Sequence, residues 1–236
     1  MSIKLAPLTA SGASVGMIED SVAGINERWH DAWGDVQKAI VDTTAALTTT
    51  VTGSTPTIVP SVTAGEVFTV TTPATDYSGI NSQVTGEKIK LELGKPFKLY
   101  GQFKCGEATQ SDFLFGACVT KTDLMATSVG HAISVVEGLF FCKIDGVTAI
   151  NAHVYVGSAQ TGIAAVGTMD TSAHEYEIEW DGTRVYFYFD KALKGSFAAS
   201  LPTNDLTLSW NLRAGSAAAN TFTIMHPAPR VIQARS

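Results

Sequence analysis

From Val67 onward the chain alternates apolar and polar residues with a period of two, which predicts β-strands rather than helices. The alternating runs are short, and turn signals such as Asp-Gly at 145–146 and 181–182 separate them. The predicted strands lie at residues 66–72, 88–93, 96–105, 112–120, 138–145, 147–157, 174–181, 184–190, 206–215 and 220–226. Short strands at this spacing, with no helix between them, predict an all-β fold of two antiparallel sheets packed as a sandwich.

Residues 1–60 have a different character. The start of the chain is small and polar and predicts an extended arm, and residues 48–65 are rich in Thr, Pro and Gly, as in a linker. Between them the apolar spacing predicts one α-helix at about residues 20–47. The chain therefore divides into residues 1–60, with arm, helix and linker, and residues 61–236, with the β-sandwich domain.

The predicted helix carries an apolar seam with heptad spacing. Its members are Trp29, Trp33, Val36, Ile40, Thr43 and Leu47. A single helix of this length cannot bury such a seam by itself, and Gly34 weakens the helix further. The helix either lies on its own domain or a partner, or forms a short parallel bundle that makes a homo-oligomer, with a trimer favoured. We expect Trp29, Trp33, Val36, Ile40 and Leu47 to form the assembly interface.

Charge and hydropathy exclude several classes of partner. The formal net charge is -6 and the 16 Lys and Arg are scattered singly, which argues against nucleic-acid binding. No apolar run of membrane-spanning length occurs, and the first residues lack the long apolar core of a secretory signal, so we expect synthesis in a cytoplasm and no membrane partner. Cys105, Cys118 and Cys142 lie in apolar runs without a Cys-x-x-Cys pair, which predicts buried free thiols.

The segment HEYEIEWDGTRVYFYFD, residues 174–190, predicts a β-hairpin. A two-residue turn at Asp181-Gly182 would pair Trp180 with Thr183 and Glu179 with Arg184. It would place Tyr176, Ile178, Val185 and Phe187 on the core face, and Glu175, Glu177, Glu179, Arg184, Tyr186 and Tyr188 on the other. The glutamates are therefore either a catalytic row or the solvated face of a strand.

The run YEIEWDGTRVYFYFDKALKGSF, followed by LTLSWNLRAG, resembles the concanavalin-like or laminin-G-like jelly roll over roughly residues 97–226. The resemblance implies a jelly-roll topology for the sandwich. It does not imply one function, because such jelly rolls include sugar-binding lectins and glycoside hydrolases.

A second run, FLFGACVTKTDLMATSVGHAISVVEGLFFCKIDGVTAINAHVYVG, is similar to structural proteins of marine tailed bacteriophages over about residues 110–190. This resemblance implies a non-enzymatic virion protein, and we expect a capsid decoration or stabilising protein. The N-terminal arm and helix would anchor it to the major capsid protein, and the virion would be its location.

The alternative is a carbohydrate-binding fibre or receptor-binding module, in which Tyr186 and Tyr188 would contact glycans. Laminarinase-like hydrolases carry a Glu-x-Asp-x-Glu strand, which Glu175-Tyr-Glu177-Ile-Glu179 resembles. The central residue here is Glu rather than Asp, and Trp180 faces away from the row. We therefore expect no catalysis.

No phosphate-binding Gly-x-x-x-x-Gly-Lys loop and no Gly-x-Ser-x-Gly elbow occurs, and the five histidines show no metal-ligand spacing. The sequence therefore predicts neither a cofactor nor a metal.

Overall fold

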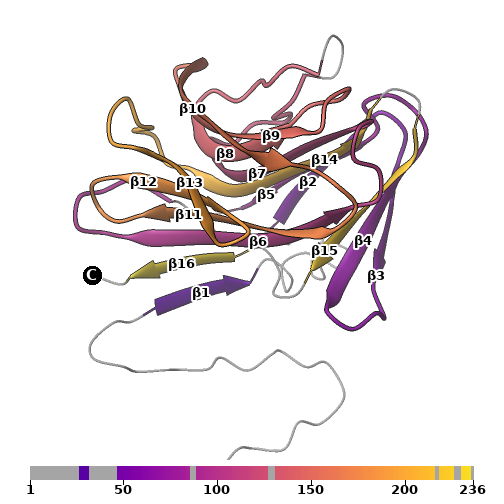
Figure 1. The fold of residues 1–236 in the computed structure, drawn as a ribbon, viewed down its shortest axis with the longest axis horizontal. Coiled ribbons are helices and arrows are strands. Elements are labelled where there is room, and N and C mark those ends of the chain that lie inside the picture. Colours follow the sequence, from indigo (N-terminus) through magenta and orange to yellow (C-terminus); the bar gives the residue numbers. More distant parts are fainter. Residues whose placement is uncertain are drawn as a thin grey trace, which may run out of the picture.

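The computed structural model describes residues 27–31, 47–85, 89–126, 131–215, 218–225 and 230–234. These residues form two antiparallel sheets that pack face to face as a jelly-roll sandwich (Figure 1). The nine-stranded sheet has the order β13-β12-β11-β6-β15-β4-β3, with β16 also paired to β6 and β1 paired to β16. The seven-stranded sheet has the order β10-β9-β8-β7-β14-β5-β2.

The strands of the nine-stranded sheet are β1 (Glu27–Asp31), β3 (Thr57–Pro60), β4 (Glu66–Thr72), β6 (Phe97–Cys105), β11 (Ala173–Trp180), β12 (Val185–Phe189), β13 (Ala192–Phe197), β15 (Asn220–Met225) and β16 (Arg230–Ala234). Those of the seven-stranded sheet are β2 (Leu47–Thr52), β5 (Gly79–Val84), β7 (Ser111–Cys118), β8 (Gly138–Lys143), β9 (Ala149–Val156), β10 (Ala159–Thr168) and β14 (Thr207–Ala214). The all-β antiparallel prediction is therefore confirmed.

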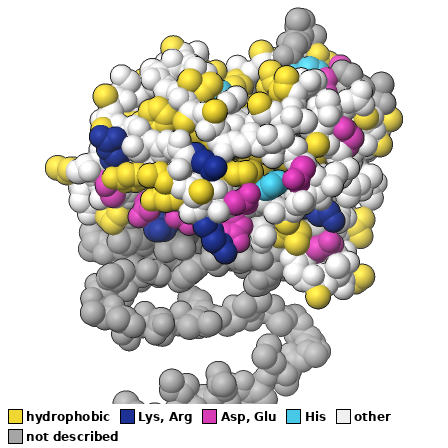
Figure 2. Space-filling view, in the orientation of Figure 1, with side chains coloured by type: hydrophobic (Ala, Val, Ile, Leu, Met, Phe, Trp, Pro, Cys, Tyr) yellow, Lys and Arg dark blue, Asp and Glu magenta, His cyan; other side chains and the backbone are white. Residues whose placement is uncertain are grey.

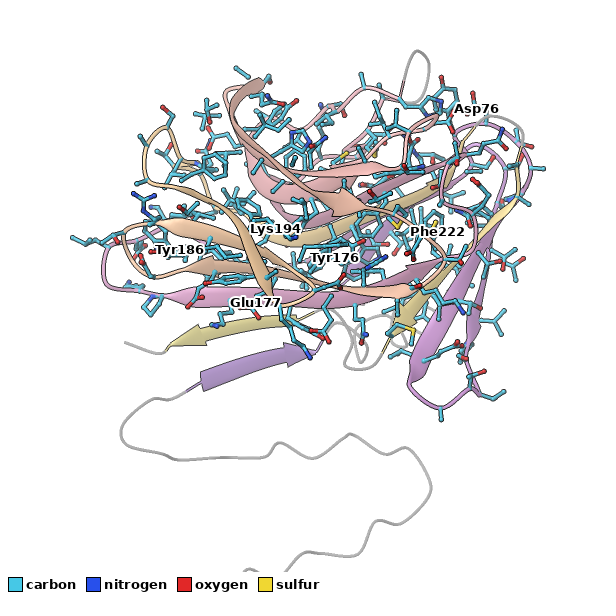
Figure 3. All side chains as sticks on the ribbon, viewed as in Figure 1. Asp76, Tyr176, Glu177, Tyr186, Lys194 and Phe222 are labelled. Atoms are coloured by element: carbon cyan, nitrogen blue, oxygen red, sulfur yellow. The ribbon has the colours of Figure 1, made fainter. Side chains whose placement is uncertain are left out.

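The main core lies between the two sheets and is rich in aromatic rings. Tyr176 on β11 is fully buried and lies within 4.9 Å of the Phe113 ring and 5.2 Å of the Phe141 ring, centroid to centroid. Figure 3 shows Tyr176 between the layers and Glu177, its neighbour on the strand, on the other side of β11. The period of two in β11 thus separates a core face from an outward face, as predicted.

The central strands of the seven-stranded sheet are covered on both faces, which explains their continuous apolar runs. Every residue of β7 and β8 is buried. Their outer faces pack in a second apolar cluster formed by Leu114, Cys118, Leu124, Met125, Val135, Phe140 and Cys142. The three cysteines are free and buried, as the sequence predicted.

The predicted helix is wrong where the structure describes it. Trp29 lies in β1, whose register pairs it with Ile232 of β16, and Leu47 begins β2, which pairs with β5. Pairing with distant strands satisfies the backbone groups of these residues, and local heptad spacing cannot reveal such partners. Trp33, Val36 and Ile40 of the expected assembly interface lie outside the described residues.

Two further predictions need correction. The Thr-rich stretch expected as a linker contributes β2 and β3, because β-branched residues suit sheet edges. The strand expected at 88–93 makes only isolated bridges, from Ile89 to Leu206 and from Glu92 to Lys95. The structure also contains β5, β10, β13 and β16, none of which the sequence predicts.

Candidate functional site

The outward face of β11 carries the three glutamates between β6 and β12. The β6 register places Glu177 opposite Tyr100 and Glu179 opposite Lys98, and the β12 register places Glu177 opposite Tyr188. In Figure 2 most of the acidic and basic side chains on the visible face lie over the lower layer, which is the nine-stranded sheet, and a few lie at the upper right. Three strands thus bring charged and tyrosine side chains to one polar face.

A shallow depression of about 230 Å³ lies over this face. The residues that line it are Lys98, Tyr100, Glu175, Glu177, Glu179, Tyr188 and Lys191. The mixture of carboxylates, ammonium groups and phenols provides hydrogen-bond acceptors, donors and aromatic surface within one hollow.

Each carboxylate of the row contacts an ammonium group. Lys98 Nζ lies 3.2 Å from Glu177 Oε1 and 3.5 Å from Glu179 Oε2, so it bridges two neighbouring glutamates. Lys191 Nζ lies 3.5 Å from Glu175 Oε1. Partial burial alone would lower the pKa of Lys98, but its hydrogen bond to Glu177 and the charges of Glu177 and Glu179 outweigh burial and raise that pKa. Lys98 is therefore held as a cation inside the row.

The turn between β12 and β13 carries Lys191 to the depression. Asp190 and Lys191 form a two-residue hairpin loop, and both have positive φ, 48° and 66°. Such turns favour Gly at the second position, so a lysine there is unusual. Asp190 Oδ1 accepts a hydrogen bond from the Glu175 backbone N–H at 2.9 Å, and Asp190 Oδ2 lies 2.9 Å from His174 Nδ1. These contacts tie the turn to the first residues of β11.

The hairpin register differs from the predicted one. Trp180 pairs with Val185 rather than Thr183, because Asp181 begins a loop that extends to Arg184. Asp181 Oδ1 accepts backbone N–H bonds from Thr183 and Arg184, both at 2.7 Å, and these bonds close the wider loop. Because the shift equals two residues, every side chain stays on its predicted face.

The wider loop also changes two predicted contacts. The Glu179–Arg184 pair does not form, because Arg184 Nη1 donates to Ser196 Oγ at 3.0 Å, while Glu179 pairs with Lys98. Tyr188 lines the depression, whereas the Tyr186 hydroxyl donates to Asp181 Oδ2 at 3.0 Å beside it. Tyr186 pairs with Glu179 and Tyr188 with Glu177, so both tyrosines lie beside the carboxylates, and of the two Tyr188 lines the depression.

Sequence reasoning missed Lys98, Tyr100 and Lys191. The alternation in Lys98-Leu-Tyr100 indicated that these two side chains share a face, but nothing local indicated that this face lies beside β11. Lys191 follows a predicted strand, and only its turn brings its ammonium group to Glu175.

A second polar cluster lies at one end of the seven-stranded sheet, and it is internal. Asp112 Oδ2 contacts His131 Nδ1 at 2.7 Å and Arg213 Nη2 at 3.2 Å, and both Asp112 and Arg213 are fully buried. Burial raises the pKa of Asp112, although Arg213 and His131 act in the opposite direction. Arg213 Nη1 also donates to the Met125 carbonyl at 2.9 Å. This cluster therefore holds the loop residues Met125 and His131 against β7 and β14.

Among the described residues, no group of three or more His, Cys, Asp or Glu side chains is arranged to hold a metal ion. None of the described segments is a helix long and apolar enough to cross a membrane.

Comparison with known proteins defines the fold class. No protein-family model matches this chain, and no curated protein sequence matches it. Solved structures do match. The carbohydrate recognition domain of Emp47p has 11% identity and a TM-score of 0.53, and the match covers 81% of this chain and 89% of that domain. At these identities the likeness shows the fold alone.

Two further solved structures have the same architecture. A carbohydrate esterase from Shiga toxin-encoding bacteriophage phi24B has 13% identity and a TM-score of 0.53, covering 90% of this chain and 100% of that one. A β-glucanase of Bacillus licheniformis has 11% identity and a TM-score of 0.54, covering 91% and 99%. The chain therefore has the jelly-roll fold found in lectin domains and glucanases.

Proposed function

We propose that this protein is a non-catalytic carbohydrate-binding protein whose site is the depression over β6, β11 and β12. The observation that carries the proposal is the composition of that hollow: three carboxylates and two tyrosine side chains on the outward face of one sheet. Carboxylates accept hydrogen bonds from sugar hydroxyls, and aromatic rings offer flat apolar surface to a sugar ring. Structural neighbours that are named as carbohydrate recognition domain and glucanase support a carbohydrate ligand.

The charge pairing of the row supports binding without hydrolysis. A retaining glycosidase needs two carboxyl groups about 5–5.5 Å apart, and one of them must donate a proton. Here each carboxylate has an ammonium nitrogen within 3.5 Å. Ammonium groups therefore occupy the carboxylate oxygens that an acid catalyst would have to present to the glycosidic oxygen.

A glycan-binding measurement with two tyrosine variants tests this proposal. We expect the full chain to bind oligosaccharides on a glycan array, and Tyr188→Ala to weaken binding about tenfold, as loss of a central aromatic contact does. Tyr186→Ala is the matched control, because Tyr186 lies on the same strand and face but outside the depression. Absence of binding to any glycan, or equal loss in both variants, would contradict the proposed site. Release of reducing sugar by the wild type would contradict the absence of catalysis.

The virion role is a second proposal, and the observation that favours it is the similarity of residues 110–190 to phage structural proteins. The major capsid protein would be the partner, and the sandwich would display its glycan site on the particle. The helical anchor first expected for this role is not available at Glu27–Asp31, which form β1. Co-sedimentation with purified phage capsids tests this proposal, and a chain that stays in the supernatant would refute it.

A further inference from the structure

The charge balance of the depression restricts which glycans it can accept. Three carboxylates and two ammonium groups line it, and three negative charges with two positive charges leave a net charge of -1. Resting on the glycan-binding function proposed above, we propose that the site selects oligosaccharides that carry free amino groups over neutral and acidic ones.

The two lysines are not equivalent as partners for a ligand. Lys98 contacts two glutamates at once, and its side chain is 44% exposed. A ligand anion that took Lys98 would leave both Glu177 and Glu179 without their cation. Among the residues that the structure describes, Lys191 forms an ion pair with Glu175 alone, and its side chain is 82% exposed, so water solvates it well. Lys191 is therefore the ammonium group that a ligand can replace.

An amino sugar supplies the chemistry that such a replacement needs. Its ammonium group can donate to Glu175 in place of Lys191, and hydrogen bonds between charged groups are stronger than neutral ones. Once Lys191 moves away, the remaining row has a net charge of -2, because only Lys98 opposes the three glutamates. The hollow then attracts a cationic ligand more strongly, whereas an N-acetyl group in the same place offers no positive charge.

An acidic glycan meets the opposite situation. Its carboxylate could bind only by taking Lys98 or Lys191 from the glutamates, and it would leave protein carboxylates unpaired beside its own negative charge. The formal net charge of the whole chain, -6, adds long-range repulsion. We therefore expect uronic-acid oligomers to be rejected.

Calorimetric titration of the full chain at pH 6 with three ligands of equal length tests the inference. The ligands are oligomers of glucosamine, N-acetylglucosamine and mannuronate. We expect the glucosamine oligomer to bind about tenfold more tightly than the acetylated one, a preference that falls as salt is added, and the mannuronate oligomer not to bind. Glu175→Gln should reduce the amino preference, the ratio of the two affinities measured for the same variant, to about twofold. Glu92→Gln, which removes an exposed carboxylate paired to Lys95 outside the depression, is the control and should keep the full preference.

The outcomes separate this inference from the function on which it rests. Equal affinity for the amino and acetylated oligomers, or tighter binding of mannuronate, would overturn the inference and leave glycan binding intact. If Glu175→Gln keeps the full amino preference, the assignment to this row is wrong. If all three oligomers fail while other glycans bind on the array, the inference also fails, and if no glycan binds at all, the proposed function fails with it.

Discussion

Phe187→Ala tests the assignment of the β11–β12 hairpin faces. The Phe187 side chain is fully buried between the sheets, and its ring lies 5.4 Å from the Phe141 ring and 5.9 Å from the Phe197 ring, centroid to centroid. Burial of such a side chain contributes about 1.5–3 kcal/mol. Each edge contact between rings contributes about 0.5–1.5 kcal/mol more, and the empty space left by truncation adds a cavity cost. We therefore expect the free energy of unfolding to fall by about 3–5 kcal/mol.

Urea denaturation followed by tryptophan fluorescence measures this loss as a lower midpoint with an unchanged slope. Tyr186→Ala is the matched control, because it removes a neighbouring aromatic side chain from the outward face of the same strand. Its hydroxyl bond to Asp181 is exposed, and we expect a loss below about 1 kcal/mol. Equal losses in the two variants would refute the assignment of the hairpin faces, and so would a larger loss for Tyr186→Ala.

Two other predictions concern backbone approach and pH. A Cβ added at Gly116 would lie 2.1 Å from the Leu139 carbonyl oxygen of β8. Gly116→Ala should therefore lower the free energy of unfolding by at least about 1–3 kcal/mol in the same assay. A neutral result would show that β7 and β8 can move apart at little cost. Burial raises the pKa of the Cys142 thiol in the folded protein. The stability that this buried thiol contributes is therefore complete below the pKa of an unfolded cysteine. It is lost as the pH rises from that value toward the pKa of the folded protein. Burial lowers the pKa of Lys143, which makes stability rise with pH and so opposes the effect of Cys142. The wild type is therefore compared with Cys142→Ala, which keeps Lys143. Between pH 7 and pH 9.5 the wild type should lose about 1.4 kcal/mol more than this variant, and identical losses would contradict the argument.

The strands were predictable where one face is exposed to solvent and the other is buried. In β11 and β12 the alternation of Glu and Tyr with apolar residues fixes both the period and the face, and a register shift of two residues left that assignment intact. The register itself was not predictable, because it depends on how the Asp181 carboxylate binds backbone N–H groups in its own loop.

The N-terminal segment shows the opposite case. Trp29 and Leu47 fit heptad spacing, but their backbones pair with β16 and β5, and such pairing depends on residues far away in the chain. The site has the same limit: the glutamate row was visible in the sequence, whereas Lys98, which lies between two of its members, comes from 79 residues before Glu177. The alternation of residues along a strand indicates which side chains share a face of that strand. Only the order of strands in the sheet indicates which strands place their side chains next to one another.

The Asp190–Lys191 turn has a consequence for the evolution and engineering of this protein. Left-handed backbone conformations cost non-glycine residues roughly 1–2 kcal/mol each, so Lys191→Gly should make the hairpin more stable. That variant would also lose the cation that now lies beside Glu175. A selection for heat resistance alone would therefore favour glycine at this position, whereas a selection for ligand recognition would retain the lysine.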